Sequence, residues 1–449
     1  MTAFVVTPTG RPLAGQVVAP GDKSIGHRAL LFSLLVDGPV RIRGLGGGAD
    51  NGRTARAVVQ LGATIARSGA ELVVTGRGLD RLVAPTAAID CGNSGTTIRL
   101  LAGLLAGQPF ASELFGDESL SRRPMARVVT PLRAMGATIT GRAGGDDVTP
   151  PLTVAPCVGR LHARTHALAI ASAQVKTALV LAGLYADGAT RVHEPGPSRD
   201  HTERLLAAMG APLEVASRAA VIDTTGWDRR LAIDAIQVPG DPSSAAFIIA
   251  AALVVGAGPA GVTCAGLNPN PTRTGFLDAL AAMGWTATLR DRRALGAGED
   301  EVTVDVAGPA PDLRGTRIAG DLTVRAIDEV PVLAAVAAIA DGETVVADAG
   351  ELRVKESDRI ATTVAMVRAF GVDASATADG LVVVGRGRGG VRAARVDAAG
   401  DHRIAMAATV LALVADGPTR IDDCDNVATS FPGFVDAMRS LGADLRVEP

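Results

Sequence analysis

Met135-Gly136-Ala137 stands at the end of a helical pattern and directly before a predicted strand. A large apolar residue, a glycine and a small or apolar residue recur in this setting at Leu61-Gly62-Ala63, Met209-Gly210-Ala211, Met283-Gly284-Trp285, Phe370-Gly371-Val372 and Leu441-Gly442-Ala443. Successive glycines are therefore 74, 74, 74, 87 and 71 residues apart. Glycine is expected at the C-terminal cap of a helix because it accepts the left-handed backbone conformation. The spacing predicts six copies of one structural unit.

Each unit holds a second helix-to-strand turn, as at Asp37-Gly38, Asp187-Gly188, Asp341-Gly342 and Asp416-Gly417. The first helix of each unit is nearly uncharged on all sides and should be buried, whereas the second is charged on one face and should lie outside. The pattern predicts an α/β fold in which three units pack their buried helices together. Six units then make two domains.

Two similar segments, Pro20-Gly21-Asp22 and Pro239-Gly240-Asp241, mark where the chain passes between the domains. We expect one domain over residues 21–239 and a discontinuous second domain over 1–20 and 240–449. The active site should lie in the cleft between them, where the buried helices begin.

Composition excludes several classes of protein. The chain has 449 residues, of which 47% are hydrophobic and 20% are charged, with a net charge of −3. This composition is typical of a globular protein, and it argues against a general nucleic-acid binder, which would need a basic excess. Apolar runs fall short of the roughly 20 residues of a membrane helix, and the first residues do not resemble a secretory signal. We therefore expect a cytoplasmic protein without nucleic-acid or membrane partners.

The four cysteines, at 91, 157, 264 and 424, form no CxxC pair. Neither a metal site nor a disulfide framework is predicted from them.

The predicted buried helices begin with polar residues. These starts read Gly21-Asp22-Lys23-Ser24, Gly92-Asn93-Ser94-Gly95-Thr96, Ala171-Ser172-Ala173-Gln174, Gly240-Asp241-Pro242-Ser243-Ser244, Ile327-Asp328-Glu329 and Gly400-Asp401-His402-Arg403. Ordinary N-capping by Ser, Asp and Asn accounts for part of this pattern. It does not account for Lys23, Gln174 or Arg403. Several helix N-termini together, with cations added, suit a substrate that carries phosphate or carboxylate groups.

Lysine is rare in the chain: only Lys23, Lys176 and Lys355 occur, and the other 41 basic residues are arginines. A general preference for arginine explains the excess but not the positions of the lysines. Each lies beside polar residues at the start of an apolar helical pattern, and we expect at least two of them to be functional.

Charged side chains also gather in the run Glu351–Arg359. A solvated helix face is the ordinary explanation of such a run. However, Lys355 and Arg359 are four residues apart and share a face, and Glu356 lies between them. With Asp328 one unit earlier, these residues have the makings of general acid–base catalysis.

Several of these segments resemble motifs of one family. Gly21–Arg28 is similar to the Lys-Ser-x-x-His-Arg signature of the EPSP synthases (3-phosphoshikimate 1-carboxyvinyltransferases). Further resemblances, in the family's order, are Gly92-Asn93-Ser94-Gly95-Thr96, Arg123-Pro124, Ser172-Ala173-Gln174-Val175-Lys176, Arg199–Glu203, Arg353–Arg359, Asp401–Met406 and Thr429-Ser430-Phe431-Pro432. Together they span nearly the whole chain and are closest to the bacterial class II branch.

The resemblance implies the enolpyruvate transferase fold: two domains like inverse α/β barrels, each of three βαβαββ repeats. It implies transfer of the enolpyruvyl group of phosphoenolpyruvate to the 5-hydroxyl of shikimate 3-phosphate, with release of phosphate. The implied enzyme needs no metal or organic cofactor, is usually a monomer, and is the target of glyphosate.

The resemblance also implies roles for individual residues. Asp328 would take the proton of the 5-hydroxyl, Glu356 would protonate the methylene carbon of phosphoenolpyruvate, and Lys23 would assist proton transfer. Shikimate 3-phosphate would contact Lys23, Ser24, Arg28, Ser172, Ala173, Gln174, Arg199, Asp328 and Lys355. Phosphoenolpyruvate would contact Lys23, Gly95, Arg123, Gln174, Arg359 and Arg403.

The chain departs from the family pattern at a few positions. Thr429 and Glu351 stand where another branch has Lys and Asn, which puts one phosphoenolpyruvate contact in doubt. The enolpyruvyl transferase that acts on UDP-N-acetylglucosamine is a poorer match, because that family has Lys-Asn where this chain has Lys23-Ser24. Two alternatives stay open: a paralogous enolpyruvyl transferase of a specialised pathway, and a non-catalytic paralogue that only binds small anions.

Overall fold

The computed structural model describes residues 2–144, 147–216 and 218–449, and its contacts divide the chain into two compact units. Unit 1 comprises the segment ending at Pro20 with residues 239–293 and 300–449, and unit 2 comprises residues 21–238 and 294–299. The sequence predicts that residues 294–299 belong with the rest of 240–449, but most of their contacts group them with unit 2, although the strands at either end of this segment pair in a sheet of unit 1. Within unit 2, His201 Nδ1 is 2.7 Å from Glu299 Oε1.

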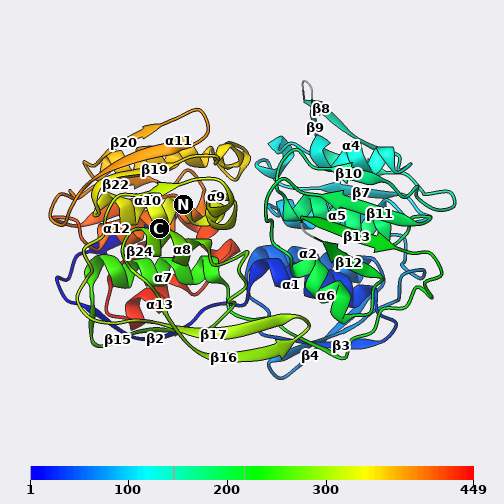
Figure 1. Ribbon diagram of the computed structural model, residues 1–449, viewed down its shortest axis with the longest axis horizontal. Coiled ribbons are helices and arrows are strands. Elements are labelled where there is room, and N and C mark those ends of the chain that lie inside the picture. The colour runs from blue at the N-terminus through cyan, green and yellow to red at the C-terminus, as the bar shows by residue number, and fades with distance from the viewer. Residues whose placement is uncertain (1, 145–146, 217) are drawn as a thin grey trace. The chain divides into compact units, whose positions relative to one another are not determined.

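Unit 2 has three inner helices that are buried over most of their length and three outer helices that are buried on one face only. The inner helices are α1 (Lys23–Leu34), α3 (Gly95–Leu105) and α5 (Ala173–Gly183). The outer helices are α2 (Ala49–Gln60), α4 (Ala126–Ala134) and α6 (His201–Ala208). Figure 1 shows them from blue to green.

Three four-stranded sheets complete unit 2. Their orders are β14 (Ala235–Gln237), β3 (Pro39–Arg43), β5 (Glu71–Thr75), β4 (Thr64–Ser68); β6 (Ile89–Asp90), β7 (Ser112–Phe115), β9 (Asp147–Val154), β8 (Ile139–Gly144); and β10 (Thr165–Ala167), β11 (Ala189–His193), β13 (Ala219–Asp223), β12 (Leu213–Ala216).

Unit 1 repeats this plan. Its inner helices are α7 (Pro242–Val255), α10 (Val330–Ala338) and α12 (His402–Ala412), and its outer helices are α8 (Gly275–Ala282), α11 (Arg359–Ala369) and α13 (Phe434–Ser440). The short helix α9 (Asp321–Ala326) and the 3-10 turn η2 (Ile327–Glu329) lead into α10, and η3 (Gly350–Val354) and η4 (Asp425–Thr429) precede α11 and α13.

The sheets of unit 1 also have four strands each. Their orders are β22 (Arg395–Asp397), β23 (Thr419–Asp422), β1 (Ala3–Thr7), β24 (Asp444–Glu448); β16 (Thr288–Gly296), β17 (Glu299–Val306), β15 (Ala257–Leu267), β2 (Leu13–Val18); and β18 (Arg317–Ile318), β19 (Asp341–Val346), β21 (Leu381–Arg386), β20 (Asp373–Ala376).

Strand pairing differs in the two repeats where the chain passes from one unit to the other. In four repeats the strand before the inner helix pairs in parallel with the strand after it, as β6 does with β7 on either side of α3. In the remaining two, β2 precedes α1 but pairs with β15 of unit 1, and β14 precedes α7 but pairs with β3 of unit 2. The N-terminal segment therefore belongs to the sheets of unit 1.

The six glycines that define the repeat all take positive φ angles, from 77° at Gly371 to 105° at Gly284. Each follows an outer helix, so the predicted C-terminal caps are confirmed.

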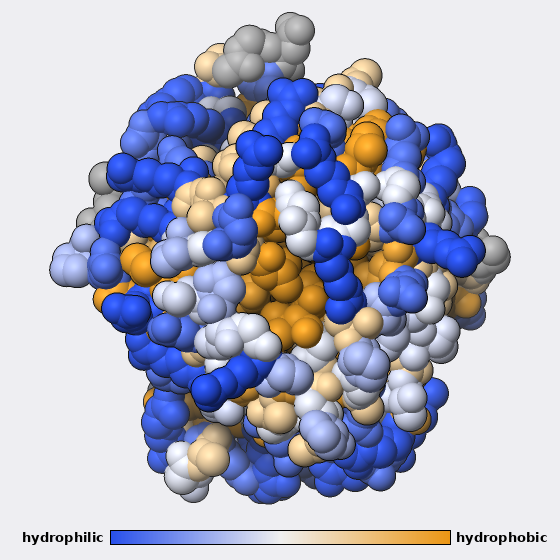
Figure 2. All heavy atoms as spheres, turned by 90° about the vertical axis from the view of Figure 1, so that its left-hand side faces the viewer, coloured by the Kyte–Doolittle hydropathy of each residue, from blue (hydrophilic) through white to orange (hydrophobic). Residues whose placement is uncertain are grey.

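Each unit has its own apolar core, centred on its three inner helices. Every residue from Ser243 to Val254 of α7 is buried. Such a helix has no face suited to water, so it requires neighbours on all sides. Figure 2 shows the left-hand side of Figure 1, where apolar residues reach the surface near the centre and in smaller areas nearer the edges, between hydrophilic residues.

At Gly103 of α3 the backbone of α5 approaches closely. A Cβ atom there would lie within 2.7 Å of three backbone atoms of Ala178. Gly103→Ala should therefore push the helices apart and cost about 1–3 kcal/mol. Gly52 of α2 is the matched control, since nothing lies within 4 Å of its added Cβ and alanine there should stabilise by about 0.5–1 kcal/mol. Urea unfolding followed by circular dichroism would measure both, and equal effects would contradict this packing.

Candidate active site

The first turns of the three inner helices of unit 2 are capped as the sequence predicts. The side chains of Asp22, Ser94 and Ser172 accept hydrogen bonds from the backbone N–H groups of Ile25, Thr97 and Val175. Each cap satisfies one donor and leaves other first-turn N–H groups for a ligand. The positive end of the helix dipole favours a negatively charged ligand at this place.

Side chains link the starts of α3 and α5. Arg99 donates a hydrogen bond to Gln174 Oε1 at 2.8 Å, and Gln174 Nε2 donates to Thr96 Oγ1 at 2.9 Å. Gly95 lies close to Arg99 and Arg123. A Cβ atom added to Gly95 would lie 2.7 Å from Arg99 Nη1 and 3.1 Å from Arg123 Nη1. The predicted residues Gly95, Arg123 and Gln174 are thus neighbours.

Lys23 and Arg123 are each held by a polar partner. Lys23 Nζ lies 3.0 Å from Asp50 Oδ2, and Arg123 Nη2 donates to Asn93 Oδ1 at 2.7 Å. Asp50 begins the outer helix α2 and carries no signal in the sequence that would have identified it.

A second group joins α1, α5 and α6. Arg199 Nη1 donates to Ser24 Oγ at 3.0 Å. Arg28 is 2% exposed and donates to Thr202 Oγ1, Thr177 Oγ1 and the Ser24 carbonyl at 2.7, 2.7 and 2.9 Å. Burial lowers the pKa of Arg28 to about 10. Arg28 therefore links residues near the starts of α1, α5 and α6.

Lys176 lies beneath this group. Its Nζ is 2.6 Å from both Glu194 Oε2 and Glu203 Oε1, and all three side chains are buried. Burial alone would lower the pKa of Lys176, but Glu203 and Glu194 outweigh it and the pKa is raised. Lys176 is a fixed cation that ties α5 to α6.

In unit 1, four of the predicted residues surround Arg359, which is 1% exposed. Arg359 Nη1 lies 3.3 Å from Asp328 Oδ1, and its Nη2 lies 2.6 Å from Glu356 Oε2. Lys355 Nζ is 3.7 Å from Asp328 Oδ1. Arg403 Nη1 donates to the Asp328 carbonyl at 2.8 Å. Asp328, Lys355, Glu356, Arg359 and Arg403 therefore form one cluster.

Asp401 is fully buried and contacts two residues of this cluster, Arg359 and Arg403. Its carboxylate lies 2.8 Å from Arg359 Nε, and it caps α12 by accepting from the Arg403 N–H at 2.9 Å. The sequence identified Asp401 as a helix start but did not predict its ion pair with Arg359.

The surroundings change the protonation of Lys355. Burial lowers its pKa below the ordinary lysine value, and Arg359 acts in the same direction, while Asp328 and Glu351 oppose the shift. The Lys355 ammonium thus loses its proton at a lower pH than an exposed lysine does.

Two further residues of the matched motifs, His27 and Thr429, have hydrogen-bond partners within their own unit. His27 is fully buried with Nδ1 2.7 Å from Thr54 Oγ1, and burial lowers its pKa well below the usual value. Thr429, at one of the departures from the family pattern, donates its hydroxyl to the Asn426 carbonyl at 2.6 Å.

Among the described residues, no group of His, Cys, Asp and Glu side chains could hold a metal ion. No helix within the same ranges is long and apolar enough to cross a membrane.

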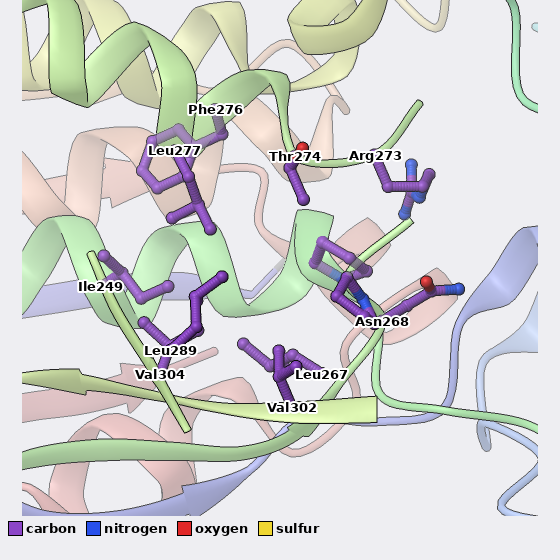
Figure 3. A pocket seen from close by; sticks show the side chains of 12 residues that line it. Ile249, Leu267, Asn268, Arg273, Thr274, Phe276, Leu277, Leu289, Val302 and Val304 are labelled. Carbon is purple, nitrogen blue, oxygen red and sulfur yellow. The ribbon is translucent and has the colours of Figure 1, made fainter. Parts of the chain in front are cut away.

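An apolar pocket in unit 1 has a lining that includes none of the residues of the charged cluster (Figure 3). Phe276 and Leu277 of α8 face Ile249 of α7 and the strand residues Leu289 and Val302 across it. This apolar lining does not suit a phosphorylated acid, so the charged helix starts are the candidate site.

The chain is similar to known proteins over almost its whole length. The profile of the EPSP synthase (3-phosphoshikimate 1-carboxyvinyltransferase) family matches residues 7–438. A 3-phosphoshikimate 1-carboxyvinyltransferase of Herpetosiphon aurantiacus is 48% identical over 422 residues, which cover 94% of this chain and 95% of that protein. One from Acidithiobacillus ferrooxidans is 46% identical over 449 residues, covering 100% and 99%.

A solved structure gives the same result. EPSP synthase from Acinetobacter baumannii superposes with a TM-score of 0.87 at 37% identity and covers 100% of both chains. Agreement in sequence and in fold over essentially the whole chain shows that this protein belongs to the EPSP synthase family.

Proposed function

We propose that this enzyme transfers the enolpyruvyl group of phosphoenolpyruvate to the 5-hydroxyl of shikimate 3-phosphate, giving 5-enolpyruvylshikimate 3-phosphate and phosphate. The observation that carries the proposal is the cluster in which Asp328, a carboxylate suited to deprotonate a hydroxyl, is surrounded by Lys355, Arg359 and Arg403. These cations suit a multiply charged anionic substrate.

The substrate groups are assigned to the helix starts described above. Shikimate 3-phosphate binds Lys23, Ser24, Arg28, Ser172, the Ala173 backbone, Gln174, Arg199, Asp328 and Lys355. Phosphoenolpyruvate binds Lys23, Gly95, Arg123, Gln174, Arg359 and Arg403. The roles draw on residues of both units, so we propose that both act on one pair of bound substrates.

The reaction proceeds by addition and then elimination. Asp328 removes the proton of the 5-hydroxyl as the oxygen bonds to C2 of phosphoenolpyruvate, and Glu356 donates a proton to the C3 methylene, giving a tetrahedral intermediate. In the elimination Glu356 recovers a proton from C3, the C2–O bond to phosphate breaks, and Lys23 assists proton transfer to the leaving group. We further propose that the protein acts as a monomer in the cytoplasm.

Asp328→Asn tests the proposed base. The wild type should release phosphate only when both substrates are present, and Asp328→Asn should reduce kcat by about 10²–10⁴-fold because the amide cannot accept the proton. Asp321→Asn, at an exposed carboxylate of α9, is the matched control and should retain activity. Wild-type inactivity would refute the assignment, and an active Asp328→Asn variant would remove the base.

Lys355 should set the alkaline limit of activity. Because its pKa is lowered, kcat/KM for shikimate 3-phosphate should fall at a lower pH than the ordinary lysine value of about 10.4. Lys355→Arg should lower the rate, but the alkaline limit of activity should move to a higher pH, since a guanidinium keeps its charge. Rates measured from pH 6 to 10 would show this change in the alkaline limit. If the arginine variant loses activity at the same pH as the wild type, Lys355 is not the titrating group.

Gly95→Ala tests the phosphoenolpyruvate subsite. The added methyl group would meet the guanidinium ends of Arg99 and Arg123 first and would displace them. We expect the KM for phosphoenolpyruvate to rise, little change in kcat, and weaker inhibition by glyphosate, which should compete with phosphoenolpyruvate in the wild type. Initial rates against both ligands would measure this, and non-competitive inhibition would contradict it.

A further inference from the structure

Glu329 is a buried carboxylate that the proposed reaction does not use. It directly follows Asp328, is 2% exposed, and occupies the N-cap position of α10. Its Oε1 atom accepts a hydrogen bond from the Ser243 hydroxyl of α7 and lies 3.7 Å from Arg403 Nη1 of α12. Its Oε2 atom is enclosed, and no residue in the described ranges offers it a hydrogen bond.

Burial of a carboxylate is costly unless positive charge and hydrogen bonds compensate it. Here the compensation comes from Arg403, from Ser243 and from the N-terminal end of α10. The three side chains sit on the three inner helices of unit 1, which pack against one another. Glu329 therefore connects the helix starts that carry the proposed chemistry.

Arg403 is held along one edge of its guanidinium. Nη1 lies between the Asp328 carbonyl at 2.8 Å and Glu329 Oε1 at 3.7 Å, and Nη2 is 3.9 Å from Asp328 Oδ2. The backbone N–H of Arg403 is fixed separately by Asp401. Because a guanidinium binds carboxylate or phosphate through a planar fork, its orientation decides how well it binds an anion.

We propose that Glu329 is a positioning residue: its charge, held in place by Ser243, sets the orientation of the Arg403 guanidinium toward phosphoenolpyruvate. The proposal rests on the proposed function. The proposal predicts an effect on the binding of phosphoenolpyruvate alone. A merely structural role would instead affect folding, or the binding of both substrates equally.

Glu329→Gln keeps the size of the side chain and an acceptor for Ser243 but removes the charge. The KM for phosphoenolpyruvate should rise by about tenfold, while the KM for shikimate 3-phosphate and the urea midpoint stay near the wild-type values. Glu329→Asp keeps the charge and should recover part of the loss. Glu343→Gln, at an exposed position of β19, is the control and should change none of these quantities.

A double-mutant cycle tests whether Glu329 acts through Arg403. Arg403→Lys removes the planar fork, so adding Glu329→Gln to it should change the KM for phosphoenolpyruvate by less than about twofold. Ser243→Ala, which leaves the charge in place, should give a smaller rise than Glu329→Gln and keeps the test available if the Gln variant fails to fold.

The outcomes separate the two proposals. An inactive wild type would overturn the proposed function. With an active wild type, the inference is overturned by an unchanged or lowered KM for phosphoenolpyruvate in Glu329→Gln, by an equal rise for both substrates, or by additive effects in the cycle.

Discussion

The structure depends on burying three apolar helices side by side in each unit. A helix such as α7, buried from Ser243 to Val254, is stable only when other helices and sheets cover every side of it. The packing also brings the helix starts together, because Arg99 reaches Gln174 from α3 to α5 and Ser243 reaches Glu329 from α7 to η2. Backbone donors and positive dipole ends therefore collect at one end of each bundle.

The charged side chains at these helix starts hold one another in place through ion pairs. Cations gathered for an anionic substrate would repel each other, and the carboxylates among them offset this repulsion. Lys23 is paired with Asp50, and Arg359 is paired with Asp328, Glu356 and Asp401. These ion pairs lie in largely enclosed surroundings where charge interactions are stronger than in water. Within each unit the charged residues therefore form a network of ion pairs.

Membership of the EPSP synthase family fits this network. The same βαβαββ unit is used six times, but its helix starts carry different side chains. Repetition gives every helix start free backbone donors, and substitutions at individual starts add charged groups, as Lys23 with Asp50 in unit 2 and Asp328 with Arg359 in unit 1.

The sequence by itself determined the repeat, the six glycine caps, the inner and outer helices and the helix starts that carry the polar residues. All of these depend on contacts within a few residues, or on the hydrophobic pattern of one helix. Only the tertiary structure decided that Asp50 pairs with Lys23, that Arg99 orients Gln174, that Glu194 and Glu203 enclose Lys176, and that residues 294–299 belong to unit 2. These partners lie far apart along the chain, or they lie on outer elements whose charged residues the sequence pattern predicts to be exposed. Their roles arise from burial and from side-chain direction, which the packing of the helices sets.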